Sequence, residues 1–188
     1  PVLKERARIK WVNDILLGDG KVSGILAYTQ SQGTTVTSAI LGIGVNVDST
    51  PSVDPTPFVP RVCAVRDFLP GDVLDVRKTT LHHLVRALAR NYGTLLREGV
   101  GPLLERYKEC SMVVGEEVTV CTDGSDRTLE ILAQGRVLTM GENLELILAG
   151  RSDPVTGGRL IMGKEVEKIQ TAATGAGEED LAPMVAEN

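Results

Sequence analysis

The chain has 188 residues, 42% of them hydrophobic, which is enough for one ordinary domain, or one domain with a small module, around a packed core. No apolar run reaches membrane-spanning length, and residues 1–6 lack the apolar segment of a signal peptide. The formal net charge is −5, and Glu178, Glu179, Asp180 and Glu187 supply −4 of it. The remaining body is nearly neutral and has few aromatic residues, which excludes the basic footprint of a nucleic-acid-binding protein.

The cysteines favour a cytoplasmic protein. Cys63, Cys110 and Cys121 are odd in number, far apart and without metal-ligand spacing. We therefore expect three buried, reduced thiols. Because the chain opens with Pro1 and has no initiator Met, we also expect an internal start.

The first 47 residues predict short strands joined by tight turns. Gly18-Asp19-Gly20 has the composition of a hairpin turn between two apolar runs. Gly42 and Gly44 interrupt the longest run, which indicates a bend or the close approach of a ligand to the backbone. The expected strands cover residues 9–13, 15–17, 22–28 and 34–47.

A loop and two helices are expected next. Residues 48–60 hold four prolines among Ser, Thr and Asp, and they predict a loop. A short helix is expected over residues 62–69. Apolar side chains then recur at steps of three and four over about residues 75–98, which predicts a long helix with a single buried stripe. Pro102 fits the first turn of a further helix over residues 102–110.

From Val113 onward the apolar period changes to two, which is typical of strands. Several short strands separated by polar or glycine turns indicate a small barrel of the SH3 type, with a boundary near Ser111. Residues 171–188 show no apolar pattern and are expected to be a disordered acidic tail. The expected strands cover residues 117–121, 129–138, 144–148, 159–162 and 166–169.

The most informative residues lie between positions 10 and 26. Residues 10–14 read Lys-Trp-Val-Asn-Asp, and residues 21–26 read Lys-Val-Ser-Gly-Ile-Leu. Polar groups at the ends of apolar strands commonly point into a site. Lys21, which leaves a tight turn, is a candidate fixed cation for negative charge, although an exposed hairpin lysine has the same pattern. Trp11 is expected in a core rather than as a stacking platform.

These motifs resemble those of the biotin–protein ligases. The family's usual forms are K-W-P-N-D, K-x-x-G-I-L and G-x-G-x-N, and this chain carries them in that order at residues 10–14, 21–26 and 42–46, with Val12 in place of the proline. The resemblance covers about residues 8–169. It implies an α/β (α+β) fold: a partial class II synthetase-like mixed sheet with helices over residues 1–111, then a small SH3-like β-barrel over residues 112–170.

The resemblance implies a two-step, ATP-dependent reaction. Biotin attacks ATP to give biotinyl-adenylate and pyrophosphate. A lysine in the biotin acceptor domain of a carboxylase, such as acetyl-CoA carboxylase, then attacks the mixed anhydride. Lys21 would be the catalytic cation, in contact with the biotin carboxyl oxygen and the α-phosphate. Mg²⁺ is expected because the substrate is ATP, but no protein ligand for a metal stands out.

The same resemblance assigns further residues to nucleotide or biotin binding. Asn13 would read an adenine edge or a phosphate oxygen, and Asp14 would bind a polar substrate group or steer the incoming lysine. Phe58 in the proline-rich loop would cap the adenine. Each of these has a plainer alternative as a turn, strand or loop residue. The assigned residues are Lys10, Asn13, Asp14, Gly24, Gly44, Asn46 and Phe58.

Two other patterns invite a metal reading. His82 and His83 have no Cys or carboxylate partner at ligand spacing, so we expect exposed or capping residues. Residues 123–126 resemble the start of a calcium loop but lack its terminal glutamate, so a hairpin turn is expected.

Two parts of the family's site do not occur in these 188 residues: the glycine–arginine-rich loop before the Lys-Trp motif, and an earlier Ser- or Thr-bearing segment. We therefore expect the chain to hold only part of the site. The missing N-terminal segment would come from a second polypeptide, from another copy of the chain in a homo-oligomer, or from nowhere, which would leave the chain poorly active. A lipoate–protein ligase and a non-catalytic binding module stay open as alternatives.

Overall fold

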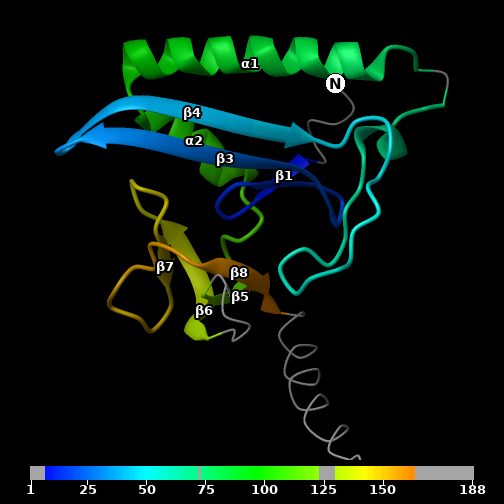
Figure 1. Ribbon diagram of the computed structural model, residues 1–188. Helices are drawn as coiled ribbons and strands as arrows, with labels where there is room; N and C mark the ends of the chain where they lie inside the picture. Colours follow the sequence, from blue (N-terminus) through cyan, green and yellow to red (C-terminus); the bar gives the residue numbers. More distant parts are fainter. Residues whose placement is uncertain (1–6, 72, 123–129, 164–188) are drawn as a thin grey trace, which may run out of the picture.

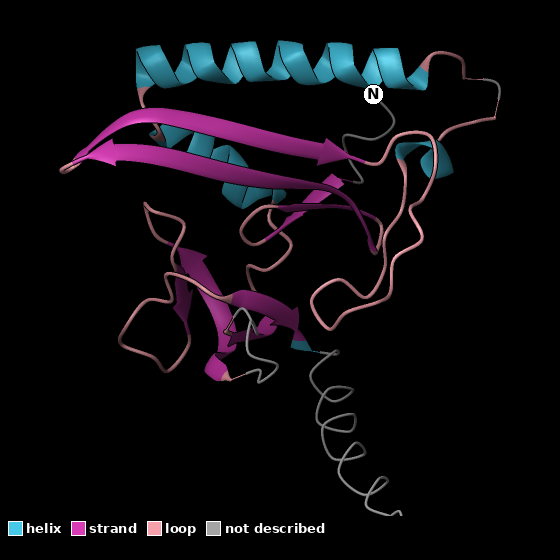
Figure 2. Cartoon of the chain, viewed as in Figure 1, coloured by secondary structure: helices cyan, strands magenta, loops and turns pink. Residues whose placement is uncertain are grey.

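The part of the chain that the structure describes folds into two four-stranded antiparallel sheets and two α-helices (Figure 1). The computed structural model describes residues 7–71, 73–122 and 130–163. The first sheet lies between a long helix and the second sheet, and Figure 2 shows this layering by element type. Within the described ranges, no helix is long and apolar enough to cross a membrane.

The first sheet follows chain order. Its strands are β1 (Ala7–Lys10), β2 (Asp14–Leu17), β3 (Gly20–Gln32) and β4 (Thr35–Val45). Gly18 takes a positive φ of 59° in the turn between β2 and β3, a conformation that glycine adopts at little cost. All three strand pairs are antiparallel, because each strand is joined to the next by a turn. The expected mixed sheet is therefore not what these strands form.

The strand register brings the sequence motifs together. Lys10 lies opposite Asp14, Asp14 opposite Gly24, and Gly24 opposite Gly44. Directly opposed residues share one face of a sheet, so these positions gather on the face that we call the motif face. Motif residues separated by up to 34 positions in the chain are thus neighbours across four strands.

Helix α1 (Val76–Glu98) has the predicted extent but not the predicted packing. Val76 is its one buried residue, so the expected single buried stripe is wrong. An apolar groove of about 1240 Å³ lies between α1 and the face of the first sheet opposite the motif face, and Leu84 of the expected stripe lines it. We call it the α1 groove. Large apolar side chains along α1 are 41–69% exposed, namely Leu81, Val85, Leu88, Tyr92, Leu95 and Leu96.

The other expected elements of the first half are confirmed. A short 3-10 helix covers Val65–Phe68, and α2 covers Gly101–Cys110 with Pro102 in its first turn. Residues 48–60 form a loop without helix or strand. Hydrogen bonds from the Thr50 hydroxyl and then the Ala64 N–H lower the pKa of Asp67, and the bond from Thr50 ties this loop to the 3-10 helix.

The second sheet confirms four of the five strands expected there. They are β5 (Glu117–Cys121), β6 (Ile131–Met140), β7 (Leu146–Leu148) and β8 (Arg159–Met162), in the order β7-β6-β5-β8. Among the described residues these strands form an open sheet, so a closed SH3-like barrel is not confirmed. The expected strand over 166–169, the turn over 123–126 and the tail over 171–188 lie outside the described residues.

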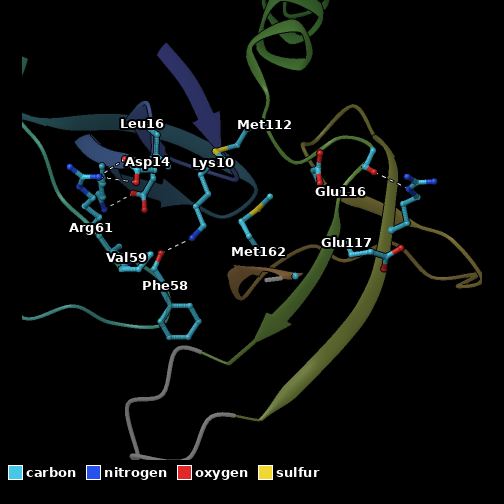
Figure 3. Close-up of a pocket in the computed structure, with 16 residues that line it drawn as sticks. Lys10, Asp14, Leu16, Phe58, Val59, Arg61, Met112, Glu116, Glu117 and Met162 are labelled. Carbon is cyan, nitrogen blue, oxygen red and sulfur yellow. Dashed lines mark hydrogen bonds and ion pairs between the residues drawn. The ribbon is translucent and has the colours of Figure 1, made fainter. Parts of the chain in front are cut away.

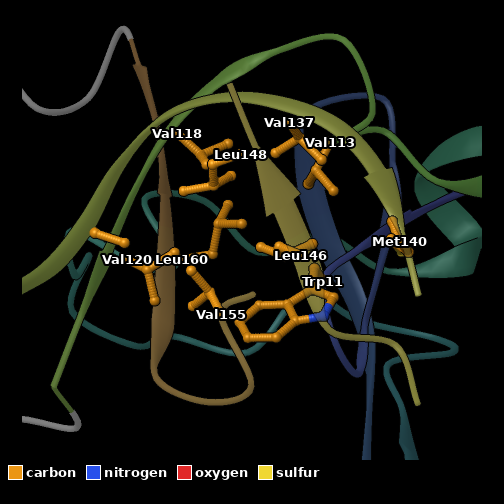
Figure 4. Packing of buried hydrophobic residues seen from close by; sticks show 11 residues of the cluster. Trp11, Val113, Val118, Val120, Val137, Met140, Leu146, Leu148, Val155 and Leu160 are labelled. Atoms are coloured by element: carbon orange, nitrogen blue, oxygen red, sulfur yellow. The ribbon is translucent and has the colours of Figure 1, made fainter. Parts of the chain in front are cut away.

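The main core belongs to the second sheet but includes a residue of the first. Trp11, which follows β1, is 7% exposed and packs in the cluster built by β5 to β8 (Figure 4). This confirms the expectation of a core tryptophan. Cys63 and Cys121 are buried as expected, whereas Cys110 is exposed, because it ends α2 on the solvent side.

Tyr107 on α2 predicts a loss of stability in alkali. Its hydroxyl donates to the Val12 carbonyl over 2.9 Å, and burial raises the pKa of Tyr107 to about 12. The unfolded phenol ionises near the ordinary value of 10, so the free energy of unfolding falls as the pH rises from about 10 to 12. The half-buried position limits the loss to about 1–2 kcal/mol.

Chemical denaturation between pH 9 and 12 measures this effect. Tyr107→Phe should be less stable than the wild type at pH 9 but should lose less stability on the way to pH 12. Tyr92→Phe, at an exposed tyrosine, is the control and should follow the wild type. Parallel curves for Tyr107→Phe and the wild type would show that Tyr107 is not the group responsible.

Candidate functional site

A cavity opens where the motif face meets the second sheet (Figure 3). We call it the polar cavity; its volume is about 570 Å³. The first sheet contributes Lys10, Asp14 and Lys21, and the proline-rich loop contributes Phe58. The opposite wall comes from the region of the second sheet and includes Met112, Glu116, Glu117, Arg136 and Met162.

An ion pair stands at the centre of the motif face. The Lys21 ammonium lies 2.6 Å from the Asp14 carboxylate, and both side chains are partly buried. Gly24 makes room for this pair, because an added Cβ there would lie 3.2 Å from Lys21 Cε and 3.3 Å from Nζ. Because Gly24 has no side chain, the Lys21 side chain has room to reach Asp14. An anionic ligand in the cavity would compete with Asp14 for the ammonium.

Lys10 and Phe58 are held together at the other side of the cavity. Lys10 is 5% exposed, and its Nζ donates to the Phe58 carbonyl over 2.6 Å. The buried Phe58 ring packs against Cys121 and Ile161, with the Arg159 guanidinium 3.9 Å from the ring centroid. In this arrangement the ring contacts the second sheet, and its role as an adenine cap stays a prediction.

The two asparagines hold strands and loops together. Asn13 Nδ2 donates to the Ile25 carbonyl over 2.7 Å, on the strand that carries Gly24. Asn46 Nδ2 donates to the Cys63 carbonyl over 3.0 Å. Both amides thus have backbone partners next to the motif face, and their assignment to substrate binding stays a prediction.

Gly44 extends a strip of the motif face that has no side chains. It lies opposite Gly24, and a Cβ added to it would meet nothing closer than the Gly24 carbonyl at 3.9 Å. Gly42 is equally open, with the Leu26 carbonyl at 3.8 Å. The strip beside the Lys21–Asp14 pair is therefore flat enough for a ligand to contact the backbone.

Several residues of the cavity escaped the sequence analysis. Arg61 and Asp19 form an exposed ion pair of 2.9 Å at its rim, and Arg136 Nε donates to the Gly115 carbonyl over 2.8 Å. In the sequence, Arg61 is marked only as a charged residue directly after the proline-rich loop, which does not predict a place in a cavity. The wall from the second sheet had no signal in the sequence, because its place depends on packing between distant segments.

The histidines lie elsewhere. His82 and His83 are on α1, exposed, with their rings in contact edge to face, so the expectation of exposed residues is confirmed. Across the described residues, no group of three or more His, Cys, Asp or Glu side chains is placed to hold a metal ion.

Sequence comparisons agree with the motifs. The model of the Biotin/lipoate A/B protein ligase family matches residues 3–46. The bifunctional ligase/repressor BirA of Bacillus subtilis (strain 168) is 27% identical over 140 residues, which are 74% of this chain and 41% of that protein. The biotin–[acetyl-CoA-carboxylase] ligase of Paracoccus denitrificans is 48% identical over 46 residues, 24% of this chain and 19% of that protein. The chain thus spans less than half the length of these relatives.

Solved structures share the fold. The apo biotin protein ligase of Aquifex aeolicus has a TM-score of 0.61 and 19% identity, over 83% of this chain and 64% of that one. The same enzyme in complex with biotin and ATP has a TM-score of 0.60 and 19% identity, over 83% and 61%. At such identity the similarity is evidence of fold alone. The chain is thus similar to biotin protein ligases over its motif region, over part of its sequence and in its fold.

Proposed function

We propose that this chain carries part of the site of a biotin–protein ligase. It would take part in forming biotinyl-adenylate from biotin and ATP and in passing biotin to a lysine in the acceptor domain of a carboxylase. The observation that carries the proposal is the Lys21–Asp14 ion pair beside the glycine strip, at the wall of a cavity large enough for a small ligand. The relatives that are named as biotin ligases support the choice of biotin.

Lys21 acts in the first step of the proposed reaction. A carboxylate oxygen of biotin attacks the α-phosphorus of ATP, a new P–O bond forms, and pyrophosphate leaves with the electrons of the broken bond. Negative charge concentrates on the α-phosphate oxygens in the transition state. The Lys21 ammonium, already held in a partly buried place, would stabilise that charge without having to be ordered during the reaction. The carboxylate and phosphate would take over the ammonium from Asp14.

Asp14 acts in the second step. The acceptor lysine attacks the acyl carbon of biotinyl-adenylate as a free amine, a C–N bond forms, the C–O bond to AMP breaks, and the amine nitrogen gives its extra proton to water. Once its own ammonium partner has turned to the phosphate, the Asp14 carboxylate is open to a positive or hydrogen-bonding group of the incoming lysine. Its position opposite Gly24 directs it to the same strip where the adenylate would lie.

The remaining assigned residues would surround the ligand. Gly24 and Gly44 allow contact with the backbone, and Lys10 stands beside the cavity as a second cation. Asn13 and Asn46 would contact the nucleotide with the atoms that their backbone hydrogen bonds leave over. Mg²⁺ would be held by the ATP phosphates, because the described residues supply no cluster of metal ligands.

A further polypeptide segment would complete the molecule. The α1 groove and the exposed apolar side chains along α1 leave apolar surface open to solvent. We infer that another segment, in the same chain or in a second copy or partner, covers it.

Native mass spectrometry of the purified chain with biotin and Mg²⁺-ATP tests the function. The expected result is a mass gain equal to biotinyl-adenylate on the chain, on its oligomer or on a co-purified complex. Lipoate in place of biotin decides between the two substrates of the family. An ATP analogue that cannot be cleaved between the α- and β-phosphates is the control, and it should give the two unreacted ligands. A chain that gains neither mass in any of its assemblies would contradict the proposal.

Lys21→Ala should lower the rate of adenylate formation by about 10²- to 10³-fold, because a preorganised charge at the reacting phosphate is lost. The measurement is biotin-dependent exchange of labelled pyrophosphate into ATP. Lys78→Ala, at an exposed lysine on α1, is the matched control and should leave the rate unchanged. Equal rates for Lys21→Ala and the wild type would remove Lys21 from the reaction.

Gly24→Ala should shift the end of the Lys21 side chain by a few tenths of an ångström and loosen its contact with Asp14, because the new methyl group would meet Lys21 Cε at 3.2 Å. The measurement is the rate at which an amine-specific reagent labels Lys21, followed by peptide mass mapping, and a rise of severalfold is expected. Gly42→Ala, in the same sheet with 3.8 Å to its nearest neighbour, should not change the rate. The same rate in both variants would show that Gly24 does not hold the pair in place.

A further inference from the structure

The turn between β1 and β2 is held from outside its own sheet. Residues 11–13 form this turn, with Lys10 directly before it and Asp14 directly after it. The Trp11 indole Nε1 donates to the Leu144 carbonyl over 2.6 Å. The turn therefore has a residue of the polar cavity on each flank, and its first residue is anchored to the second sheet.

The anchor is deep. Trp11 is 7% exposed in the main core of the second sheet, and Figure 4 shows its ring beside Val155 and Leu146. Its acceptor Leu144 has a positive φ of 63°, unusual for a residue with a side chain, in the segment before β7. The indole is thus fixed in two ways: by packing, which needs its apolar ring, and by a hydrogen bond, which needs its Nε1 donor.

The neighbouring backbone is clamped as well. The Ile9 carbonyl accepts from the Met112 N–H over 2.9 Å, in the link between α2 and β5. On the other side of the turn, the Ile25 N–H donates to the Asn13 carbonyl over 3.0 Å. The turn consequently bridges β3, which contains Lys21, and the second sheet.

A second contact repeats the arrangement. Lys10 Nζ donates to the Phe58 carbonyl, and the Phe58 ring is buried against β5 and β8 under the Arg159 guanidinium. Lys10 is thereby held at its backbone by the turn and at its ammonium by a loop that is itself anchored on the second sheet.

We propose that Trp11 is a positioning residue, through which the second sheet fixes Lys10 and Asp14 relative to Lys21. The second sheet is then a structural part of the polar cavity and not a separate docking module. The part of this inference that concerns turnover rests on the proposed function; the part that concerns the geometry of the Lys21–Asp14 pair does not.

Trp11→Phe and Trp11→Leu test the inference. Trp11→Phe keeps an aromatic ring and loses the hydrogen bond to Leu144, and Trp11→Leu loses the ring as well. Val118→Ala is the matched control, because Val118 is buried in the same core at the end away from Trp11 (Figure 4). Unfolding in denaturant first establishes that the variants fold and how much stability each has lost.

Two readouts do not need enzyme activity. The amide hydrogen of Ile25, which donates to Asn13, should exchange about tenfold faster in Trp11→Leu than in Val118→Ala at matched stability, with Trp11→Phe between them. The labelling rate of Lys21 should rise in the same order. If the Trp11 variants change exchange only within β5 to β8, and leave Ile25 and Lys21 as in the wild type, the inference is wrong.

Turnover separates this inference from the proposed function. In an active assembly, Trp11→Phe should lower kcat/KM for adenylate formation severalfold while Val118→Ala does not. If the wild type neither binds nor turns over the substrates, the proposed function fails, and the exchange and labelling rates still decide the role of Trp11. Equal losses of kcat/KM in Trp11→Phe and Val118→Ala would leave Trp11 with no more than a stabilising role and would overturn the inference.

Discussion

The burial of Trp11 in the core of the second sheet is the interaction on which the rest of this molecule depends. A large aromatic side chain buries several times the apolar area of a small side chain. The removal of the Trp11 ring from water therefore holds the two sheets in one arrangement. The same residue begins the turn that joins Lys10 to Asp14. A contact that stabilises the fold therefore also decides where the polar groups of the cavity stand.

The Lys21–Asp14 pair shows how the cavity is prepared for negative charge. A partly buried ammonium with a single carboxylate partner is kept in place, yet its partner can be exchanged for a substrate oxygen. Gly24 takes part through the absence of a side chain, as does Gly44 across the strand pair. The glycines and the charges of the motifs are thus one structural unit, with the glycines providing space and the charges providing the chemistry.

The two faces of the first sheet have opposite characters. The motif face meets the second sheet around charged residues, while the other face and α1 border an apolar groove of about 1240 Å³. Burial of an amphipathic helix needs a surface to pack on, and α1 has apolar side chains without one among the described residues. Its periodicity therefore predicted a helix correctly and a buried stripe wrongly.

The sequence by itself determined most of the strands, both α-helices and the proline-rich loop. The spacing of apolar residues, the glycine turns and the prolines that predict these elements act over only a few residues. The sequence also singled out Lys21 and Asp14, since the order and spacing of the motifs can be read without a structure. Tertiary structure alone decided that Phe58 packs on the second sheet, that Arg136 lines the cavity and that the strands stay open among the described residues. Those outcomes depend on contacts between segments far apart in the chain, and no local pattern encodes which distant surfaces will meet.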